Sequence, residues 1–333
     1  MSKIIIGIHG LGNKPPEDLL REWWLKSICE GLKKINRYCF EPNFEIVYWA
    51  DILNDKPLNN LISDPENPYY LDEPYTPSTD SLENKPHTTR QKFLDFLEEQ
   101  MDKIFLNEDN SSNFNFIYDL IFKKYFKELV IYYSQDESSN DDSDKSAKES
   151  IRNRLVEVIK KHKGKEIFII AHSMGSIIAY DVCSLLVKDL TIDTLVTMGS
   201  PLGVPIIFGK IAEELKSLNP ETDHPRVPEN VKRGWFNFSD IEDIVAMNYN
   251  LGDDYGPNSS GLEIKDFVVS NNYMINNERN PHKSYGYLRT PEFSLILADF
   301  LEKDIGPLKM WYLKISCELK QLFKRISVFI KRR

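Results

Sequence analysis

The sequence lacks an excess of basic residues, has few cysteines and contains no long apolar run. Its 42 Lys and Arg are outnumbered by 51 Asp and Glu, and the net charge is -9. No nucleic-acid partner is expected, because phosphate binding needs a basic surface. The four cysteines form no Cys-x-x-Cys pair and no zinc spacing, so we expect free thiols in a reducing compartment. No uncharged apolar stretch of about 18 residues, enough to span a bilayer, is present.

The N-terminal end carries no recognisable targeting segment. The apolar run Ile4–Ile8 is too short for a signal peptide and is not followed by a cleavage region, so we expect a cytoplasmic protein. Of the 333 residues, 41% are hydrophobic, which is enough to bury a large core and excludes a wholly disordered chain. We therefore expect one domain, residues 1–306, interrupted by an insertion at 54–145 and followed by a separate C-terminal segment.

Apolar strand patterns alternate with helical patterns through most of this domain. Strands alternating with helices predict an α/β fold with a mostly parallel sheet covered by helices on both faces. The expected strands cover 4–8, 44–49, 166–171, 194–198, 234–238 and 264–270, and the expected helices begin near 17 and cover 147–161, 176–187, 206–218 and 291–301.

The insertion interrupts this alternation. Residues 54–87 are rich in Pro, Asn, Asp and Tyr and predict a long loop, and helical patterns follow at 93–104 and 116–130. Its aromatic residues would suit a helical lid over an active site, although a helical pair packed away from the site explains the same pattern. The acidic run at 136–144 could bind calcium, but a solvated loop is the favoured interpretation.

The strongest local signal is a nucleophile-elbow pattern. Residues Ala171-His172-Ser173-Met174-Gly175 follow an apolar strand and precede an apolar helix, and they match G-x-S-x-G with Ala in the first position. Small residues are needed there because a serine on a tight strand-to-helix turn is strained and crowded. The alternative is a strand, turn and helix with an incidental serine. The context favours Ser173 as a nucleophile.

A glycine-rich turn, His9-Gly10-Leu11-Gly12, follows the first strand. An oxyanion hole of this type needs one N–H group after the nucleophile and one from an early loop. We expect Met174 to supply the first and Leu11 the second, and we expect His9 to be structural. The turn could instead bind a phosphate, but the longer GxGxxG and GxxxxGK fingerprints are absent.

If the chain order is Ser, acid, His, the general base must lie beyond the last strands and the acid between it and the serine. His282 is the histidine at the C-terminal position, since the others belong to the two motifs, precede the serine or precede the candidate acid. The acid is sought after the strand at 234–238, where Asp240, Glu242 and Asp243 are candidates. Asp243 is favoured, because an apolar pair follows it that could anchor the loop, but any of the three could be a solvated charge.

Taken together, these motifs resemble the α/β-hydrolase superfamily of lipases and esterases. The resemblance covers the chain outside roughly 54–145 and the last 25 residues, and it includes the Gly-Ser-Pro-Leu-Gly segment at 199–203. It implies the α/β-hydrolase fold, a triad of Ser173, Asp243 and His282, and an acyl-enzyme mechanism. It implies neither a metal nor a cofactor.

The C-terminal segment, residues 307–333, carries eight Lys or Arg and one acid, Glu318. Apolar residues recur there at steps of three and four, which is typical of a basic amphipathic helix. Such a helix could contact a membrane surface peripherally, bind a second copy, or pack on the acidic body of the protein. Its apolar stripe consists of Leu308, Trp311, Ile315, Leu319, Leu322, Ile326 and Phe329.

The sequence therefore predicts an intracellular hydrolase of carboxylic esters, with a small-molecule or lipid-like acyl ester as substrate. A thioesterase or a peptidase-like amidase would use the same site. An inactive binding protein on the same fold is a further alternative, which the retained Ser, Asp and His disfavour.

Overall fold

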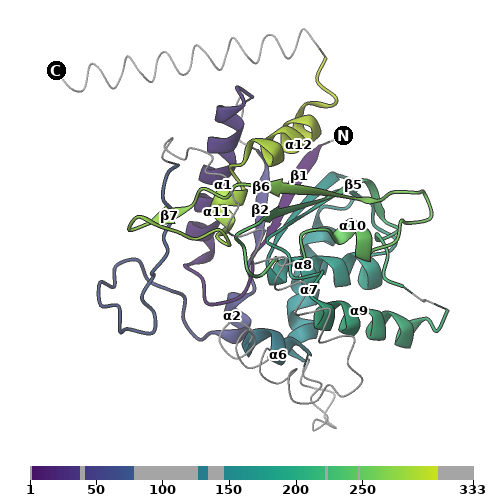
Figure 1. Cartoon of the computed structure of the whole chain (residues 1–333), viewed down its shortest axis with the longest axis horizontal. Coiled ribbons are helices and arrows are strands. Elements are labelled where there is room, and N and C mark those ends of the chain that lie inside the picture. The colour runs from purple at the N-terminus through teal and green to yellow at the C-terminus, as the bar shows by residue number, and fades with distance from the viewer. Residues whose placement is uncertain are drawn as a thin grey trace.

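The computed structural model describes residues 2–37, 42–78, 127–133, 146–221, 224–246 and 248–306. The predicted alternation forms a central six-stranded sheet in the order β2-β1-β3-β4-β5-β6, in which every neighbouring pair is parallel (Figure 1). The strands are β1 (Lys3–Ile8), β2 (Phe44–Val47), β3 (Glu166–His172), β4 (Ile192–Met198), β5 (Val231–Asp240) and β6 (Ile264–Val269).

Helices flank both faces of this sheet, as predicted, and alternate residues of each strand contribute to two separate cores. In β1, Ile4 and Ile6 belong to one core, whereas Ile5 belongs to the other. Continuous apolar strands are therefore explained by burial on both faces. The first core includes side chains from α6 (Lys127–Tyr133), α7 (Ala147–Lys161), α8 (Met174–Asp181) and α9 (Pro205–Leu218), and the second from α1 (Glu17–Lys34), α11 (Ser284–Tyr287) and α12 (Pro291–Glu302).

Several elements differ from the sequence prediction in extent. The helix expected at 176–187 is α8 followed by a π-helical turn, Val182–Leu186. A hydrophobic pattern cannot distinguish the two, because both bury the same short apolar run. Beyond the sheet lie a small antiparallel pair, β7 (Met274–Ile275) and β8 (Glu278–Arg279), and two short helices, α2 (Ala50–Leu53) and α10 (Leu251–Asp254).

The described parts of the insertion are residues 54–78, which form no regular helix or strand, and α6. A buried polar cluster attaches α6 to the body: the Tyr132 hydroxyl donates to Asp181 at 2.6 Å, and the Arg152 guanidinium pairs with the same carboxylate at 2.5 Å. The predicted helix at 93–104, the acidic run and the C-terminal segment lie outside the described residues. Within the part that is described, no helix has both the length and the apolar character needed to cross a membrane.

The carboxyl ends of the parallel strands share one edge of the sheet. His9 follows β1, Ser173 follows β3, Gly199 follows β4 and Asp243 lies in the turn after β5. Open α/β sheets bind their ligands at this edge, because the loops there converge while the strands hold them in place. Residues from distant parts of the sequence are thus brought to one place.

Candidate active site

Ser173 lies on a strained turn between β3 and α8. Its backbone has φ 54° and ψ -129°, a conformation that non-glycine residues rarely adopt. A Cβ on Gly175 would lie 2.6 Å from the Ile8 carbonyl oxygen, so this position tolerates only glycine. Ala171 is fully buried within the sheet, where its single methyl group is accommodated. The turn therefore has the local geometry predicted for a nucleophile elbow.

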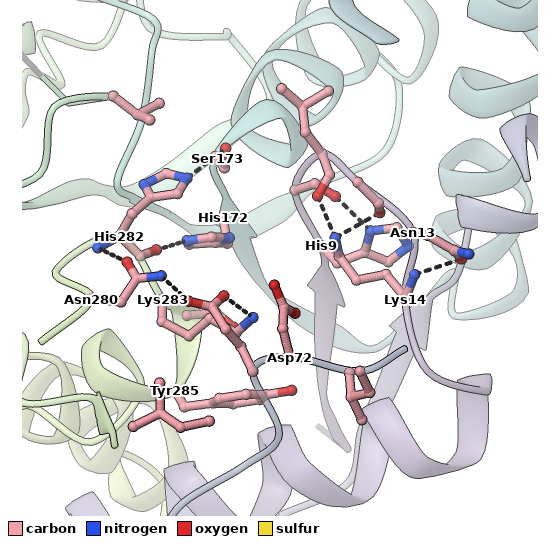
Figure 2. A pocket seen from close by; sticks show the side chains of 18 of the residues that line it. His9, Asn13, Lys14, Asp72, His172, Ser173, Asn280, His282, Lys283 and Tyr285 are labelled. Atoms are coloured by element: carbon pink, nitrogen blue, oxygen red, sulfur yellow. Dashed lines mark hydrogen bonds and ion pairs between the residues drawn. The ribbon is translucent and has the colours of Figure 1, made fainter. Parts of the chain in front are cut away.

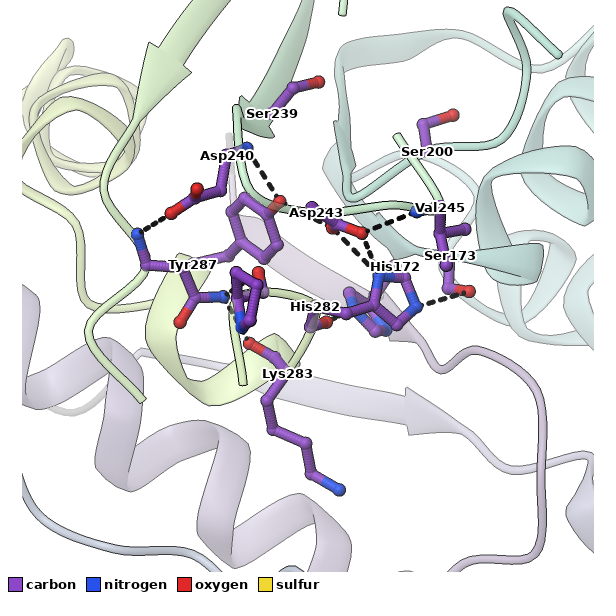
Figure 3. Close-up of polar contacts among 12 residues, drawn as sticks. His172, Ser173, Ser200, Ser239, Asp240, Asp243, Val245, His282, Lys283 and Tyr287 are labelled. Atoms are coloured by element: carbon purple, nitrogen blue, oxygen red, sulfur yellow. Dashed lines mark hydrogen bonds and ion pairs between the residues drawn. The ribbon is translucent and has the colours of Figure 1, made fainter. Parts of the chain in front are cut away.

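The structure brings the predicted Ser, His and Asp together (Figure 3). His282 Nε2 lies 3.0 Å from Ser173 Oγ, and His282 Nδ1 lies 2.9 Å from both carboxylate oxygens of Asp243. Since the carboxylate only accepts, Nδ1 carries the proton and Nε2 is left to accept one from the serine. The Asp243 side chain is fully buried, whereas 28% of the His282 side chain is exposed.

Asp243 is held by groups that the sequence did not indicate. The Tyr287 hydroxyl donates to Asp243 Oδ2 at 2.7 Å, and the Val245 amide donates to Oδ1 at 2.9 Å. Burial and the nearby Asp243 charge raise the pKa of Tyr287 well above its usual value, so the hydroxyl keeps its proton. A Cβ on Gly199, whose φ is +54°, would lie 2.7 Å from Asp243 Oδ2. These contacts fix the carboxylate beside the imidazole.

The competing acids have other partners. Asp240 forms an ion pair with Arg279 and accepts a hydrogen bond from the Asn271 amide at 2.6 Å. Glu242 pairs with the other guanidinium nitrogen of Arg279. Burial raises the pKa of Asp240 above its ordinary value of 3.8, and the neighbouring hydrogen bonds and Arg279 oppose this. Asp240 and Glu242 thus brace the turn, and Asp243 is the acid that contacts His282.

His172, the residue before the serine, contacts the backbone of His282. Its Nε2 lies 2.6 Å from the His282 carbonyl oxygen, and the two ring centroids are 4.8 Å apart. Burial, followed by the charge of His282, holds the pKa of His172 well below its ordinary value of 6.5. A neutral His172 must carry its proton on Nε2, since a carbonyl oxygen can only accept. His172 therefore has a structural role, which is to hold the backbone of His282.

The glycine-rich turn after β1 packs directly on the serine. A Cβ on Gly10 would lie 2.5 Å from Ser173 Cβ. His9 is buried: its Nε2 accepts from the Trp49 amide at 3.1 Å, so its Nδ1 carries a proton and donates to the Gly10 carbonyl at 2.9 Å. Lys14 Nζ donates to the carbonyls of Leu11 and Gly12. His9 therefore holds the Gly10–Leu11 peptide next to the nucleophile, and Lys14 holds the two peptides that follow it.

The pocket beside Ser173 has a volume of about 820 Å³. Figure 2 shows His282 and Lys283 on one side and His9 and Lys14 on the other, with Asp72 between them. The pocket wall combines apolar and charged side chains. Its apolar part includes Leu11, Leu20, Trp24, Leu58, Leu71, Ile244 and Tyr285, and its charged part includes Lys14, Asp72, Glu73, Arg279 and Lys283.

The remaining described histidines lie elsewhere. His162 pairs with Glu45 at 2.7 Å, and His224 packs against Phe208 with ring centroids 5.5 Å apart. His87 lies outside the described residues. Among the residues that the structure describes, no group of three or more His, Cys, Asp or Glu side chains could hold a metal ion. Cys29 and Cys183 are free thiols.

Comparison of the chain with models of known protein families, with curated proteins and with solved structures finds no match.

Proposed function

We propose that this protein is a serine hydrolase of the α/β-hydrolase type that cleaves carboxylic esters. The observation that carries the proposal is the hydrogen-bonded series from Ser173 through His282 to Asp243, with separations of 3.0 and 2.9 Å. A base within about 2.6–3.2 Å of a hydroxyl can take its proton, and a carboxylate on the other imidazole nitrogen fixes the required tautomer. The positive φ of Ser173 is independent support, because this strain presents the hydroxyl above the sheet.

The proposed reaction proceeds through an acyl-enzyme. His282 Nε2 takes the Ser173 proton as Oγ attacks the ester carbonyl carbon, which forms a tetrahedral intermediate. His282 then gives this proton to the alcohol, which leaves as the C–O bond breaks. A water molecule repeats the sequence on the acyl-enzyme: His282 takes its proton, hydroxide adds to the carbonyl, and Ser173 Oγ leaves with the proton returned.

The negative oxygen of each tetrahedral intermediate needs donors that are already in place. The proposed donors are the backbone N–H groups of Leu11 and Met174. Met174 is the first residue of α8, where the helix dipole favours negative charge. The contact of His9 with the Gly10 carbonyl supports Leu11, because it restricts the rotation of the peptide that carries the Leu11 N–H group, and Lys14 holds the next peptide.

The mixed pocket wall supports an ester with an apolar acyl group and a polar leaving group. Apolar side chains such as Leu20, Trp24 and Leu71 suit an acyl chain, and Lys14 and Asp72 of the charged part suit a polar alcohol. Lipid-like esters combine both properties. Thioesters and amides would use the same nucleophile. A binding protein without turnover is disfavoured, because such a protein has no need of a His282 oriented between Asp243 and Ser173.

A panel of esters tests the proposal. We expect hydrolysis of p-nitrophenyl acetate, butyrate and octanoate, with kcat/KM rising from acetate to the longer chains because the pocket buries additional methylene groups. The matched butyryl thioester and anilide should be hydrolysed more slowly than the butyrate ester. A folded protein that cleaves none of these compounds would contradict the proposal, and a preference for the anilide would instead favour an amidase.

A further inference from the structure

The loop that carries His282 lies between β8 and α11 and is held through its backbone carbonyls. Asn271 Nδ2 donates to the carbonyls of Pro281 and Lys283, each at 2.8 Å. His172 donates to the carbonyl of His282 itself. The two donors lie at the carboxyl ends of β3 and β6, and the same loop also contacts Glu73 of the insertion.

Residues 69–78, which we call the strap, are fixed to the body of the protein. The Tyr273 hydroxyl donates to the Pro74 carbonyl at 2.7 Å, and the buried Arg289 guanidinium donates to the Thr76 carbonyl at 2.7 Å. Tyr70 and Leu71 of the strap line the pocket beside Ser173. This part of the insertion is therefore a wall of the pocket, anchored on elements that also adjoin His282.

Glu73 connects the strap to the loop of His282 at two points. Its Oε2 pairs with Lys283 Nζ at 2.7 Å, and its Oε1 accepts a hydrogen bond from Asn280 Nδ2. Asn280 in turn accepts from the His282 amide through Oδ1 at 2.9 Å. Burial opposes ionisation of Glu73, but Lys283, with smaller contributions from Asn280 and His282, holds the pKa of its carboxyl below the ordinary value. The Glu73 carboxylate is therefore charged, and it binds Asn280 and Lys283, the residues that flank Pro281 and His282 in the chain.

We propose that Glu73 is a positioning residue that keeps His282 within reach of Ser173. This inference rests on the hydrolase function proposed above. No strand of the central sheet carries His282, so its place depends on the side chains that bind its loop, among them Asn271, His172 and Glu73. Glu73 acts through Asn280 and Lys283 and does not take part in proton transfer. The insertion thus contributes to turnover through its strap.

The test compares Glu73→Ala and Glu73→Gln with Glu66→Gln, a control on an exposed residue of the same insertion. With p-nitrophenyl butyrate, Glu73→Ala is expected to lower kcat by about 10- to 100-fold with KM little changed, because displacing a reacting group by about 1 Å has effects of this size. Glu73→Gln keeps the shape and should lose less. Asn280→Ala should show a similar loss, and the double variant should lose less than the product of the two single effects.

An unchanged kcat in Glu73→Ala would overturn the inference, and so would a rise in KM alone, because that result places Glu73 on the substrate. A second readout separates this inference from the proposed function. The downfield proton resonance of His282 Nδ1–H, identified by its loss in His282→Gln, should shift or broaden in Glu73→Ala and stay unchanged in Glu66→Gln. If the parent protein hydrolyses no ester, the proposed function fails, and this resonance alone decides the inference: an unchanged signal overturns it.

Discussion

Replacing Ser173 with alanine is expected to lower kcat for ester hydrolysis by a factor on the order of 10⁴–10⁶, the range found when one member of a catalytic triad is removed. The substitution deletes one hydroxyl and leaves the other contacts of the turn, including the Ser173 amide to the Met198 carbonyl at 3.0 Å. The fold and Tm should therefore be retained. Initial rates with p-nitrophenyl butyrate and thermal unfolding by circular dichroism measure both.

Ser27→Ala is the matched control for this variant. Ser27 is also a fully buried serine, and its hydroxyl donates to the Trp23 carbonyl at 3.1 Å within α1, away from the pocket lining. Ser27→Ala also removes one buried hydroxyl. Because Ser27 does not line the pocket, the kcat of this variant should equal that of the parent. If Ser173→Ala hydrolyses the ester at the parental rate, Ser173 is not the nucleophile.

Replacing His282 with alanine should be nearly as damaging as Ser173→Ala, because the nucleophile then has no base at 3.0 Å. Asp243→Asn should lower kcat by about 10⁴, since an amide at this position favours the wrong imidazole tautomer. Asp240→Asn should affect kcat much less. It should instead lower the free energy of unfolding, because Asp240 is buried and paired with Arg279.

Measurements of kcat and of urea unfolding on the three variants test this ordering. The free energy of unfolding should fall most in Asp240→Asn, and kcat should fall least there. A larger loss of kcat in Asp240→Asn than in Asp243→Asn would show that the acid has been misassigned. Parental activity in His282→Ala would remove the proposed base.

The sheet could be predicted because its signals are local. Ile4–Ile8 and residues 167–171 have no polar side chain, and burial on both faces requires this. The exact residues at which the strands begin and end were harder to predict. The strand expected from Gly234 in fact begins at Val231, which pairs with Ile192 of β4. The prediction missed these first residues because the exposed Lys232 and Arg233 interrupt the apolar pattern.

The proximity of Ser173, His282 and Asp243 could also be predicted, from one motif and the chain order, whereas their catalytic roles stay predictions. Their supports could not be predicted. Tyr287, Asn271 and Glu73 act through a few side-chain contacts with residues of other elements, and no periodicity or spacing marks such contacts. The donor roles of Leu11 and Met174 stay predictions, because they concern an intermediate that forms only during the reaction.

The proposed mechanism requires Ser173 to be an activated nucleophile, and a fluorophosphonate probe measures this without knowledge of the natural substrate. The probe forms a covalent bond with an activated serine oxygen as its leaving group departs. Incubation of the folded protein followed by peptide mass spectrometry should show one adduct, on Ser173. Labelling should be absent in Ser173→Ala and strongly slowed in His282→Ala. An unlabelled folded protein, or an adduct on a different residue accompanied by ester hydrolysis, would contradict the account.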